Sequence, residues 1–253
     1  MTDTSIAATH LAEGNFRVGS VIRRSASVLL RHFLTFSIVA VIAYSPILLL
    51  AEARTAEQTD LTEAVSMLAW YVLGLILLIV FSTLGDAIIM HAAFQDICRR
   101  RVRLVESLNA ILRHFLPIVG LAFVMHFLIW VGLILLIIPG FIIYMMWFVG
   151  LPACVVERLG PWTSLRRSRD LTKGHRWKIF FGLALLLIVI SLGSKLLEFE
   201  LTITASPAVG LFGRLIWKGV WSAFASVLVV VTYHDLRTAK EGIDIEQVAV
   251  VFD

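Results

Sequence analysis

Long apolar runs separated by short polar connections dominate the pattern along this chain. An α-helix rises about 1.5 Å per residue, so about 20 apolar residues cross the hydrocarbon core of a bilayer. Because lipid offers the backbone no hydrogen-bond partners, such runs are expected to be helical. The pattern predicts about six transmembrane helices, over residues 33–51, 65–90, 115–137, 140–157, 179–197 and 212–233.

Three of these spans need a further argument. The third and fourth come from one uncharged run, residues 115–156, which as a single helix would be about twice as long as the membrane is thick. Pro139-Gly140 lies near the middle of this run and is typical of a tight turn. The sixth span is the weakest, because only residues 219–233 are free of charge. Either segment 208–218 joins it in the membrane, or that segment is an interfacial helix before a short span.

Basic segments stand before three of the predicted hairpins and are expected to be amphipathic helices, over residues of about 16–30, 92–112 and 161–173. In the first two, apolar side chains recur with the helical period of about 3.6 residues. In the third, Pro161 fits the first turn and Gly174 fits the end. Basic amphipathic helices lie in the headgroup layer, with Lys and Arg toward anionic phosphates. Each segment is therefore predicted to lie flat at the membrane surface.

A short motif indicates internal repetition. LRHFL at residues 30–34 recurs at residues 112–116, and a looser copy, KGHRW, stands at residues 173–177. Either the chain holds three units, each an interfacial helix followed by a transmembrane hairpin, or aromatic and arginine residues gather independently at this depth. Both interpretations give the same fold class, an all-α polytopic membrane protein.

Composition and charge support this class. The chain has 253 residues, 59% hydrophobic and 16% charged, whereas about 25% of residues are charged in soluble domains. Eighteen of the 22 Lys and Arg residues fall in the N-terminal segment, the second and fourth connections and the C-terminal tail. By the positive-inside rule, both termini are expected in the cytoplasm and the protein in the bacterial inner membrane. The same rule accounts for the net charge of +4, so nucleic acid is not an expected partner.

The most specific pattern starts in the middle of the chain and continues to near its C-terminus. Its residues are Pro139-Gly140, Pro152, Glu157, Gly160-Pro161, Ser164-Leu165, Arg167-Ser168, Leu171-Thr172, Gly174, Trp177, Tyr233-His234-Asp235-Leu236-Arg237 and Glu241-Gly242. On these residues the chain resembles a bacterial family of six-span proteins named after the membrane domain of glycerophosphoryl diester phosphodiesterase. The resemblance implies a helical membrane fold and little about activity. In the named enzyme, catalysis belongs to a separate soluble barrel, for which this chain has no room.

Basic residues in two connections are the candidates for binding anionic lipid or a protein partner: Arg99, Arg100, Arg101, Arg166, Arg167, Arg169 and Lys173. Guanidinium groups bind phosphate through charge-assisted hydrogen bonds. Glu157 ends the fourth span, one short helix away from the second group. An ion pair between Glu157 and this group would lock the interfacial helix against the bundle, and the alternative is a solvated basic face. Ser168 and Gly174 are further structural candidates.

Titratable side chains at membrane depth are functional candidates, because their burial in lipid is costly. Asp86 lies inside the cytoplasmic end of the second span and His91 follows it, so the pair is a candidate proton relay or cation site. The alternative is that Asp86 pairs with an arginine of the next loop. His126 lies in the third span, where a neutral histidine bonded to a neighbouring helix would be structural. No metal or cofactor is indicated, because neither the histidines nor the cysteines have the spacing of ligands.

Taken together, the patterns favour a non-enzymatic inner-membrane protein that interacts with lipid, or serves as a scaffold for a partner, at the cytoplasmic face. The alternative is a transporter or permease of a small or amphiphilic solute, because repeated transmembrane units are common in transporters. The sequence contains no glycine-rich phosphate loop, serine nucleophile elbow or HExxH motif, so an enzyme is not expected.

Overall fold

The computed structural model describes residues 18–55, 64–204 and 207–241. Over these ranges the chain forms helices joined by short connections and contains no strand. Among the described residues, five helices are long and apolar enough to cross a membrane: Leu68–Ile97, Phe115–Leu135, Ile138–Glu157, Arg176–Leu197 and Val209–Glu241. The expected fold class is confirmed, and the protein is an all-α polytopic membrane protein.

The helices follow one another closely along the chain. They are α2 (Val18–Arg31), α3 (Phe33–Thr55), α4 (Ala64–Ile97), α5 (Leu104–Arg113), α6 (Phe115–Leu135), α7 (Ile137–Trp147), α8 (Gly150–Glu157), α9 (Pro161–Thr172), α10 (Arg176–Thr204) and α11 (Pro207–Glu241). A sixth crossing is present if α2 and α3 are counted as one broken span, although the chain bends by 90° between them. The first expected span, residues 33–51, lies within α3.

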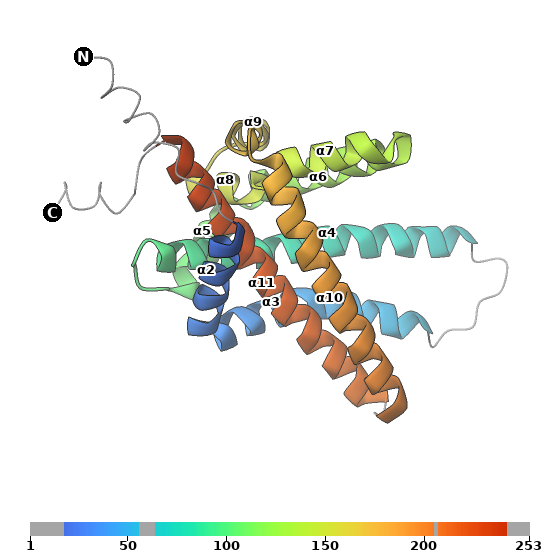
Figure 1. Ribbon diagram of the computed structural model, residues 1–253. Helices are drawn as coiled ribbons and strands as arrows, with labels where there is room; N and C mark the ends of the chain where they lie inside the picture. Colours follow the sequence, from blue (N-terminus) through green and yellow to red (C-terminus); the bar gives the residue numbers. More distant parts are fainter. Residues whose placement is uncertain (1–17, 56–63, 205–206, 242–253) are drawn as a thin grey trace, which may run out of the picture.

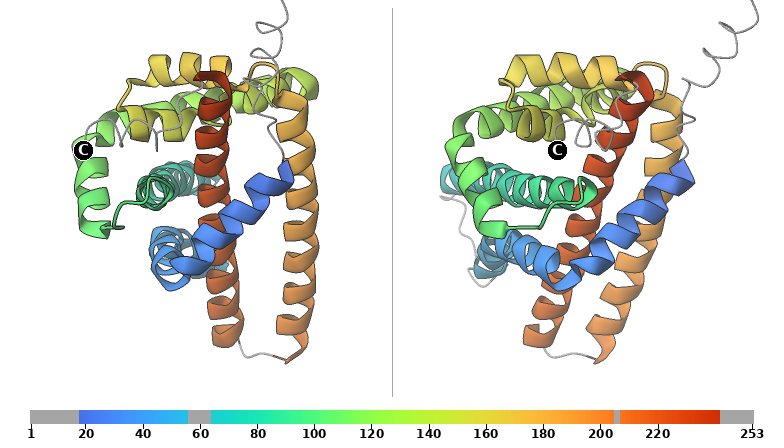
Figure 2. Two further views of the ribbon diagram at one scale, coloured as in Figure 1. Left: turned by 60° about the vertical axis from the view of Figure 1, so that its left-hand side comes forward. Right: turned by 90° about the vertical axis from the view of Figure 1, so that its left-hand side faces the viewer.

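Three hairpins, α3–α4, α6–α7 and α10–α11, extend from one shared base (Figure 1). The right-hand view of Figure 2 looks along α4, and in it α2, α5 and α9 run across the base. This is the orientation that helices lying on a membrane surface require. In the same view α10 and α11 are drawn at nearly full length, so this hairpin runs steeply across α4, and Figure 1 shows the oblique angle between them.

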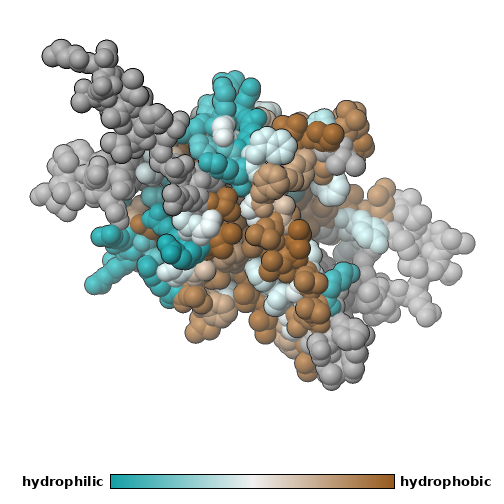
Figure 3. Space-filling model, viewed as in Figure 1, coloured by the Kyte–Doolittle hydropathy of each residue, from teal (hydrophilic) through white to brown (hydrophobic). Residues whose placement is uncertain are grey.

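The surface divides in the same way as the ribbon. Figure 3 shows hydrophilic side chains over the base and hydrophobic ones over the hairpins. Near the α6–α7 turn, Ile134 is 80% exposed and Ile138 is 74% exposed. An aqueous surface rarely carries apolar patches of this extent, so the hairpins are the part of the molecule that lipid surrounds.

The expected helix over residues 92–112 is wrong as a single element. Helix α4 continues to Ile97, residues 98–103 are not helical, and α5 begins only at Leu104. Arg99 has a φ of 54°, a left-handed conformation that a right-handed helix cannot contain. The side-chain oxygen of Gln95 accepts the backbone N–H of Arg103 at 3.0 Å, which ties the start of α5 to the end of α4.

The turn in the apolar run 115–156 lies a few residues before the expected position. Leu136 alone is extended, with φ −159° and ψ 126°, and it joins α6 to α7. Pro139 lies within the first turn of α7, where its missing N–H is not needed for the helix. A Cβ on Gly140 would lie 2.5 Å from the backbone nitrogen of Leu133. Pro139-Gly140 is therefore part of the packing of the hairpin and not its turn.

The fourth expected span, residues 140–157, lies within the candidate span Ile138–Glu157, which is interrupted at Phe148 and Val149 between α7 and α8. Pro152 follows the break and removes one backbone donor from the continuing helix. The fifth and sixth expected spans, 179–197 and 212–233, lie within α10 and α11. Segment 208–218 belongs to the continuous α11, so a separate interfacial helix before a short span is wrong.

The largest core cluster forms around α11, which contacts α2, α3 and α4. Glycines let these helices approach one another closely. A Cβ on Gly219 of α11 would lie 2.5 Å from Cγ2 of Val41 on α3. A Cβ on Gly85 of α4 would collide with the Cβ of Ala43 on α3. Small residues at contacts are the usual way in which membrane helices pack, because lipid provides no hydrophobic drive for their association.

Candidate functional site

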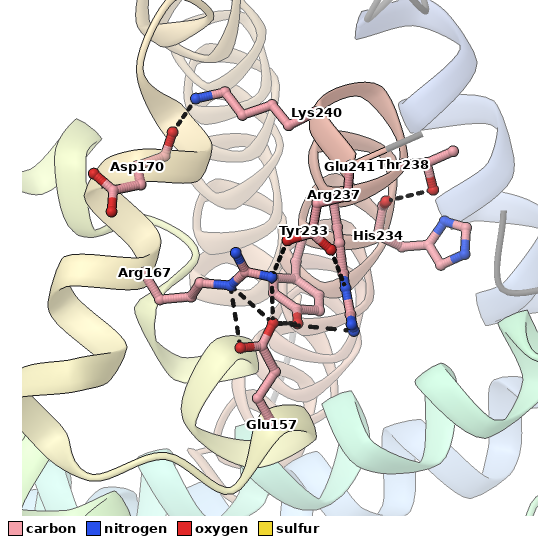
Figure 4. Close-up of polar contacts among 9 residues, drawn as sticks. All are labelled: Glu157, Arg167, Asp170, Tyr233, His234, Arg237, Thr238, Lys240 and Glu241. Carbon is pink, nitrogen blue, oxygen red and sulfur yellow. Dashed lines mark hydrogen bonds and ion pairs between the residues drawn. The ribbon is translucent and has the colours of Figure 1, made fainter. Parts of the chain in front are cut away.

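A network of charged and polar side chains connects α8, α9 and α11 at the base (Figure 4). We call it the junction network, and it consists of Glu157, Arg167, Tyr233, Arg237 and Glu241. The Nε of Arg167 donates to both carboxylate oxygens of Glu157, at 3.0 and 3.1 Å. The hydroxyl of Tyr233 donates to Glu157 Oε1 at 2.5 Å. One carboxylate at the end of α8 thus holds both an interfacial helix and a spanning helix.

The second half of the junction network lies on α11. Arg237 Nε donates to Glu241 Oε2 at 2.9 Å, and Arg167 Nη2 also contacts Glu241. The charged side chains are between 18% and 27% exposed. Two guanidinium groups and two carboxylates cancel in charge, so the network is neutral as a whole. Pairs that are partly buried and share hydrogen bonds are worth more than exposed ones.

Arg167 is the residue that bridges the two carboxylates. Burial alone would lower its pKa, but hydrogen bonds and charges from Glu241 and Glu157 outweigh burial and raise the pKa of this guanidinium above its ordinary value. Arg167 therefore stays charged, and it is held by the protein and not available to an external anion.

Local sequence places these groups. Arg158 follows α8 in a left-handed conformation with φ 53°, which ends that helix immediately after Glu157. Gly160 is extended and Pro161 occupies the first turn of α9, as the sequence predicts. Gly174 has a φ of 92° and turns the chain from α9 into α10. The expected stop at Gly174 is thus present, and it requires the left-handed conformation that glycine adopts easily.

Ser168 connects α9 to the break in the fourth span. Its hydroxyl donates to the backbone carbonyl of Met146 at 3.0 Å, and Thr172 Oγ1 donates to the same oxygen at 3.2 Å. Met146 lies at the end of α7, where the helix breaks, and both hydroxyl-bearing residues are fully buried. Buried carbonyls need hydrogen-bond partners, especially near lipid. Ser168 therefore fixes the interfacial helix to the irregular part of the span.

The remaining basic candidates point outward. Arg166, Arg169 and Lys173 are exposed on or just after α9, while Arg167 alone turns toward the junction network. The ion pair expected between Glu157 and this group is present, but it uses only one arginine. The other basic candidates, Arg99, Arg100 and Arg101, are exposed in the connection between α4 and α5.

Asp86 and His91 do not form a relay pair. Asp86 Oδ1 accepts hydrogen bonds from Ser226 at 2.8 Å and Ser222 at 3.1 Å, both on α11. His91 instead has its Nδ1 3.0 Å from the hydroxyl of Ser107 on α5. The alternative partner for Asp86, an arginine of the next loop, is also wrong, because within the described ranges its contacts are these serines.

His126 is exposed on α6, and its Nδ1 lies 2.8 Å from the carbonyl oxygen of Ala122, one turn earlier in the same helix. The expectation of a bond to a neighbouring helix is therefore wrong. A histidine can satisfy itself in this way without any contact between helices.

Sequence reasoning did not select several residues that the structure brings into contact. Ser222 and Ser226 stand four residues apart in an apolar run, a spacing that puts two hydroxyls on one helix face. That spacing was a usable signal for the partner of Asp86. Thr172 had no such signal, since only the fold brings it to Met146.

Comparisons with protein families, with curated proteins and with solved structures find no match for this chain. The resemblance to the family named after the phosphodiesterase membrane domain stays a prediction. In the part of the chain that the structure describes, no cluster of three potential metal ligands occurs. Fold and site together define a polytopic helical membrane protein whose polar groups are concentrated at one end.

Proposed function

We propose that this protein is a non-enzymatic protein of the bacterial inner membrane that binds anionic lipid headgroups at the cytoplasmic face, with both termini in the cytoplasm. The observation that carries the proposal is the division of the basic residues on α9. Arg167 is neutralised inside the junction network, whereas Arg166 and Arg169 are exposed at the base. The junction network uses Arg167, whereas Arg166 and Arg169 stay accessible to an external anion.

The location of the exposed arginines supports a lipid ligand. α9 lies across the base, so its exposed side chains stand at the level of the headgroups if the hairpins are in the bilayer. Each Lys or Arg near an anionic surface contributes about 1 kcal/mol of attraction. Arg99, Arg100 and Arg101 add a second group at the same end. A cytoplasmic protein partner with an acidic surface would use the same side chains.

A binding assay tests the proposal. Detergent-purified protein is titrated with fluorescent phosphatidylglycerol and phosphatidylcholine, and Arg166→Gln/Arg169→Gln is compared with Lys195→Gln/Arg214→Gln, which removes the same charge from the α10–α11 hairpin. We expect the first variant to bind phosphatidylglycerol roughly tenfold more weakly than wild type and the second to bind as wild type does. Equal affinity in all three proteins, or no preference for the anionic lipid, would reject lipid binding and leave the protein partner.

Asp86 supports a second candidate function, a transporter or permease. Among the described residues, the hydrogen-bond partners of the Asp86 carboxylate are serine hydroxyls, and a carboxylate of this kind in a spanning helix is a feature of proton- and cation-coupled transport. If transport occurs, ion or proton flux into proteoliposomes should disappear in Asp86→Asn and persist in Arg166→Gln/Arg169→Gln. Flux that is the same in Asp86→Asn as in wild type would remove this candidate.

A further inference from the structure

A second basic cluster lies where α9, α10 and α11 meet, and the junction network does not use it. Lys240 donates to the backbone carbonyl of Asp170, and the charges of Lys173 and Arg176 repel its ammonium group. Within the described ranges, the carboxylate of Asp170 is the negative charge that acts on Lys240, and it offsets one of the three cations. The cluster therefore keeps an excess of positive charge.

Arg176 has an unmet donor. Its Nε is buried and has no hydrogen-bond partner among the described residues. A buried donor without an acceptor costs free energy. Arg176 also begins α10, and the unpaired backbone N–H groups of a helix start favour an anion. An anionic oxygen beside the cluster would balance its excess charge and meet the backbone N–H groups at the start of α10.

An apolar groove starts one helical turn further along α10. It lies between α2, α10 and α11, is a shallow open depression with a cavity volume of about 20 Å³, and is lined among others by Val18, Ile22, Ile179, Leu183, Leu228 and Thr232. Figure 2 shows α2 crossing toward α10. Ile179 of the groove wall stands three residues after Arg176, so the groove begins about one turn along α10 from the basic cluster.

We propose that Lys173, Arg176 and Lys240 bind the phosphate of one anionic phospholipid, and that one of its acyl chains lies along the open side of the groove between α2 and α10. The inference rests on the proposed function and deepens it, because it gives a single saturable site in addition to general attraction by exposed arginines. Trp177, 74% exposed beside Arg176, is the kind of aromatic side chain that lies at the headgroup level.

The two parts of the site together select a lipid over a soluble anion. A free phosphate would meet the cations and leave the apolar groove empty, whereas a neutral lipid would fill the groove and leave the cations without a counterion. Only an anionic amphiphile satisfies both. The groove is shallow, which suits a flexible chain lying along a helix.

Native mass spectrometry of the full chain, purified in mild detergent and reloaded with defined lipid, tests the headgroup half of the site. Lys173→Gln/Arg176→Gln and Lys195→Gln/Arg214→Gln remove the same charge, the second from a part of the α10–α11 hairpin outside both proposed binding surfaces. We expect wild type and the second variant to retain one phosphatidylglycerol, and the first variant to retain it at roughly tenfold lower occupancy. Equal occupancy in both variants would overturn the site.

Tryptophan substitutions test the groove half. Ile22→Trp and Leu183→Trp fill the groove from opposite walls, and Leu187→Trp, at a side chain that is 55% exposed on α10, is the matched control. The retained lipid should be lost from the first two variants and kept by the control. If one of the two groove variants fails to fold, the other still tests the groove. Retention in both folded groove variants would contradict the proposal.

A competition experiment separates this site from the general function. Inorganic phosphate and glycerophosphate at millimolar concentration should not displace the retained phosphatidylglycerol, and displacement by either would mean a soluble-anion site and overturn the inference. Wild type that binds phosphatidylglycerol only in proportion to its fraction in the detergent, with no retained molecule, refutes the site alone. Wild type without any preference for phosphatidylglycerol over phosphatidylcholine refutes the proposed function as well.

Discussion

Helices α10 and α11 form one hairpin of similar arms, yet they have opposite surroundings. In the most apolar stretch of α10, 6% of the residues are buried inside the protein, whereas in that of α11 56% are buried. α11 carries Ser222, Ser226 and the three residues that it contributes to the junction network, and each of them meets a partner on another helix. In lipid, apolar side chains gain little by leaving acyl chains for protein. The comparison teaches that polar contacts and close packing, and not hydrophobicity, decide which arm enters the bundle.

The largest loss of stability is expected from removing Glu157, the carboxylate that connects α11 to α8 and α9. Glu157→Ala leaves Arg167 and Arg237 to share Glu241 alone within the junction network and leaves Tyr233 without its acceptor, and it should destabilise the protein by about 3 kcal/mol. Unfolding in mixed detergent–SDS micelles measures this. Glu106→Ala is the control, because Glu106 is 56% exposed in a surface pair with Arg103 and should cost about 0.5 kcal/mol or less. Equal losses in the two variants would show that the junction network does not anchor α11.

The close packing of α11 against α3 is expected to make the second-largest contribution to stability. Gly219→Leu would place a side chain against Val41 of α3 and should destabilise by about 1–3 kcal/mol. The matched control is Gly74→Leu on α4, where an added Cβ meets nothing within 4 Å. The same micelle unfolding assay compares them. If Gly74→Leu proves as harmful as Gly219→Leu, the tight approach of α11 to α3 is not what stabilises the bundle.

The serine contacts of Asp86 should contribute less. Asp86→Ala removes two hydrogen bonds between α4 and α11, and such bonds average about 0.6 kcal/mol each between membrane helices, so a loss of about 1 kcal/mol is expected. A double-mutant cycle with Ser222→Ala/Ser226→Ala isolates the coupling. Additive losses would mean that these groups do not interact. Ser45→Ala, whose hydroxyl bonds to its own helix, is the control.

The smallest effect is expected on α10. Leu185→Ala and Ile188→Ala truncate side chains that are 58% and 64% exposed, and each should change stability by less than about 0.5 kcal/mol. The measurement is the same unfolding free energy. A loss above 1 kcal/mol at either position would place α10 inside the bundle, or inside an oligomer, and remove the contrast with α11.

The hairpins could be predicted from the sequence because one physical quantity, the length of an uncharged run, determines them. The ends of the helices could not be predicted in this way. Hydropathy stops at the first charged residue, whereas α11 continues from the expected end at residue 233 to Glu241, because its last charged side chains find partners on α8 and α9. The separation of α4 from α5 depends on the left-handed Arg99, which no periodicity reveals.

The site was predictable where sequence neighbours carry it and not where distant elements meet. Glu157 and Arg167 stand ten residues apart with a helix start between them, and their ion pair could be expected. The Asp86–His91 pair failed because five residues along a helix turn side chains to different faces. The partner of Asp86 is 140 residues away on α11, so the spacing of Ser222 and Ser226 marks a polar helix face and the packing of the two helices is needed to bring that face to Asp86.

The central claim is that all basic connections share one side of the membrane and that the hairpins cross it. Single cysteines at Arg100, Lys173 and Leu136, in a chain with Cys98 and Cys154 replaced by serine, test it with a membrane-impermeant maleimide on spheroplasts and on inside-out vesicles. We predict that the cysteine at 136 is labelled on spheroplasts and that those at 100 and 173 are labelled only on inside-out vesicles. Labelling of positions 100 and 173 from opposite sides would contradict the account.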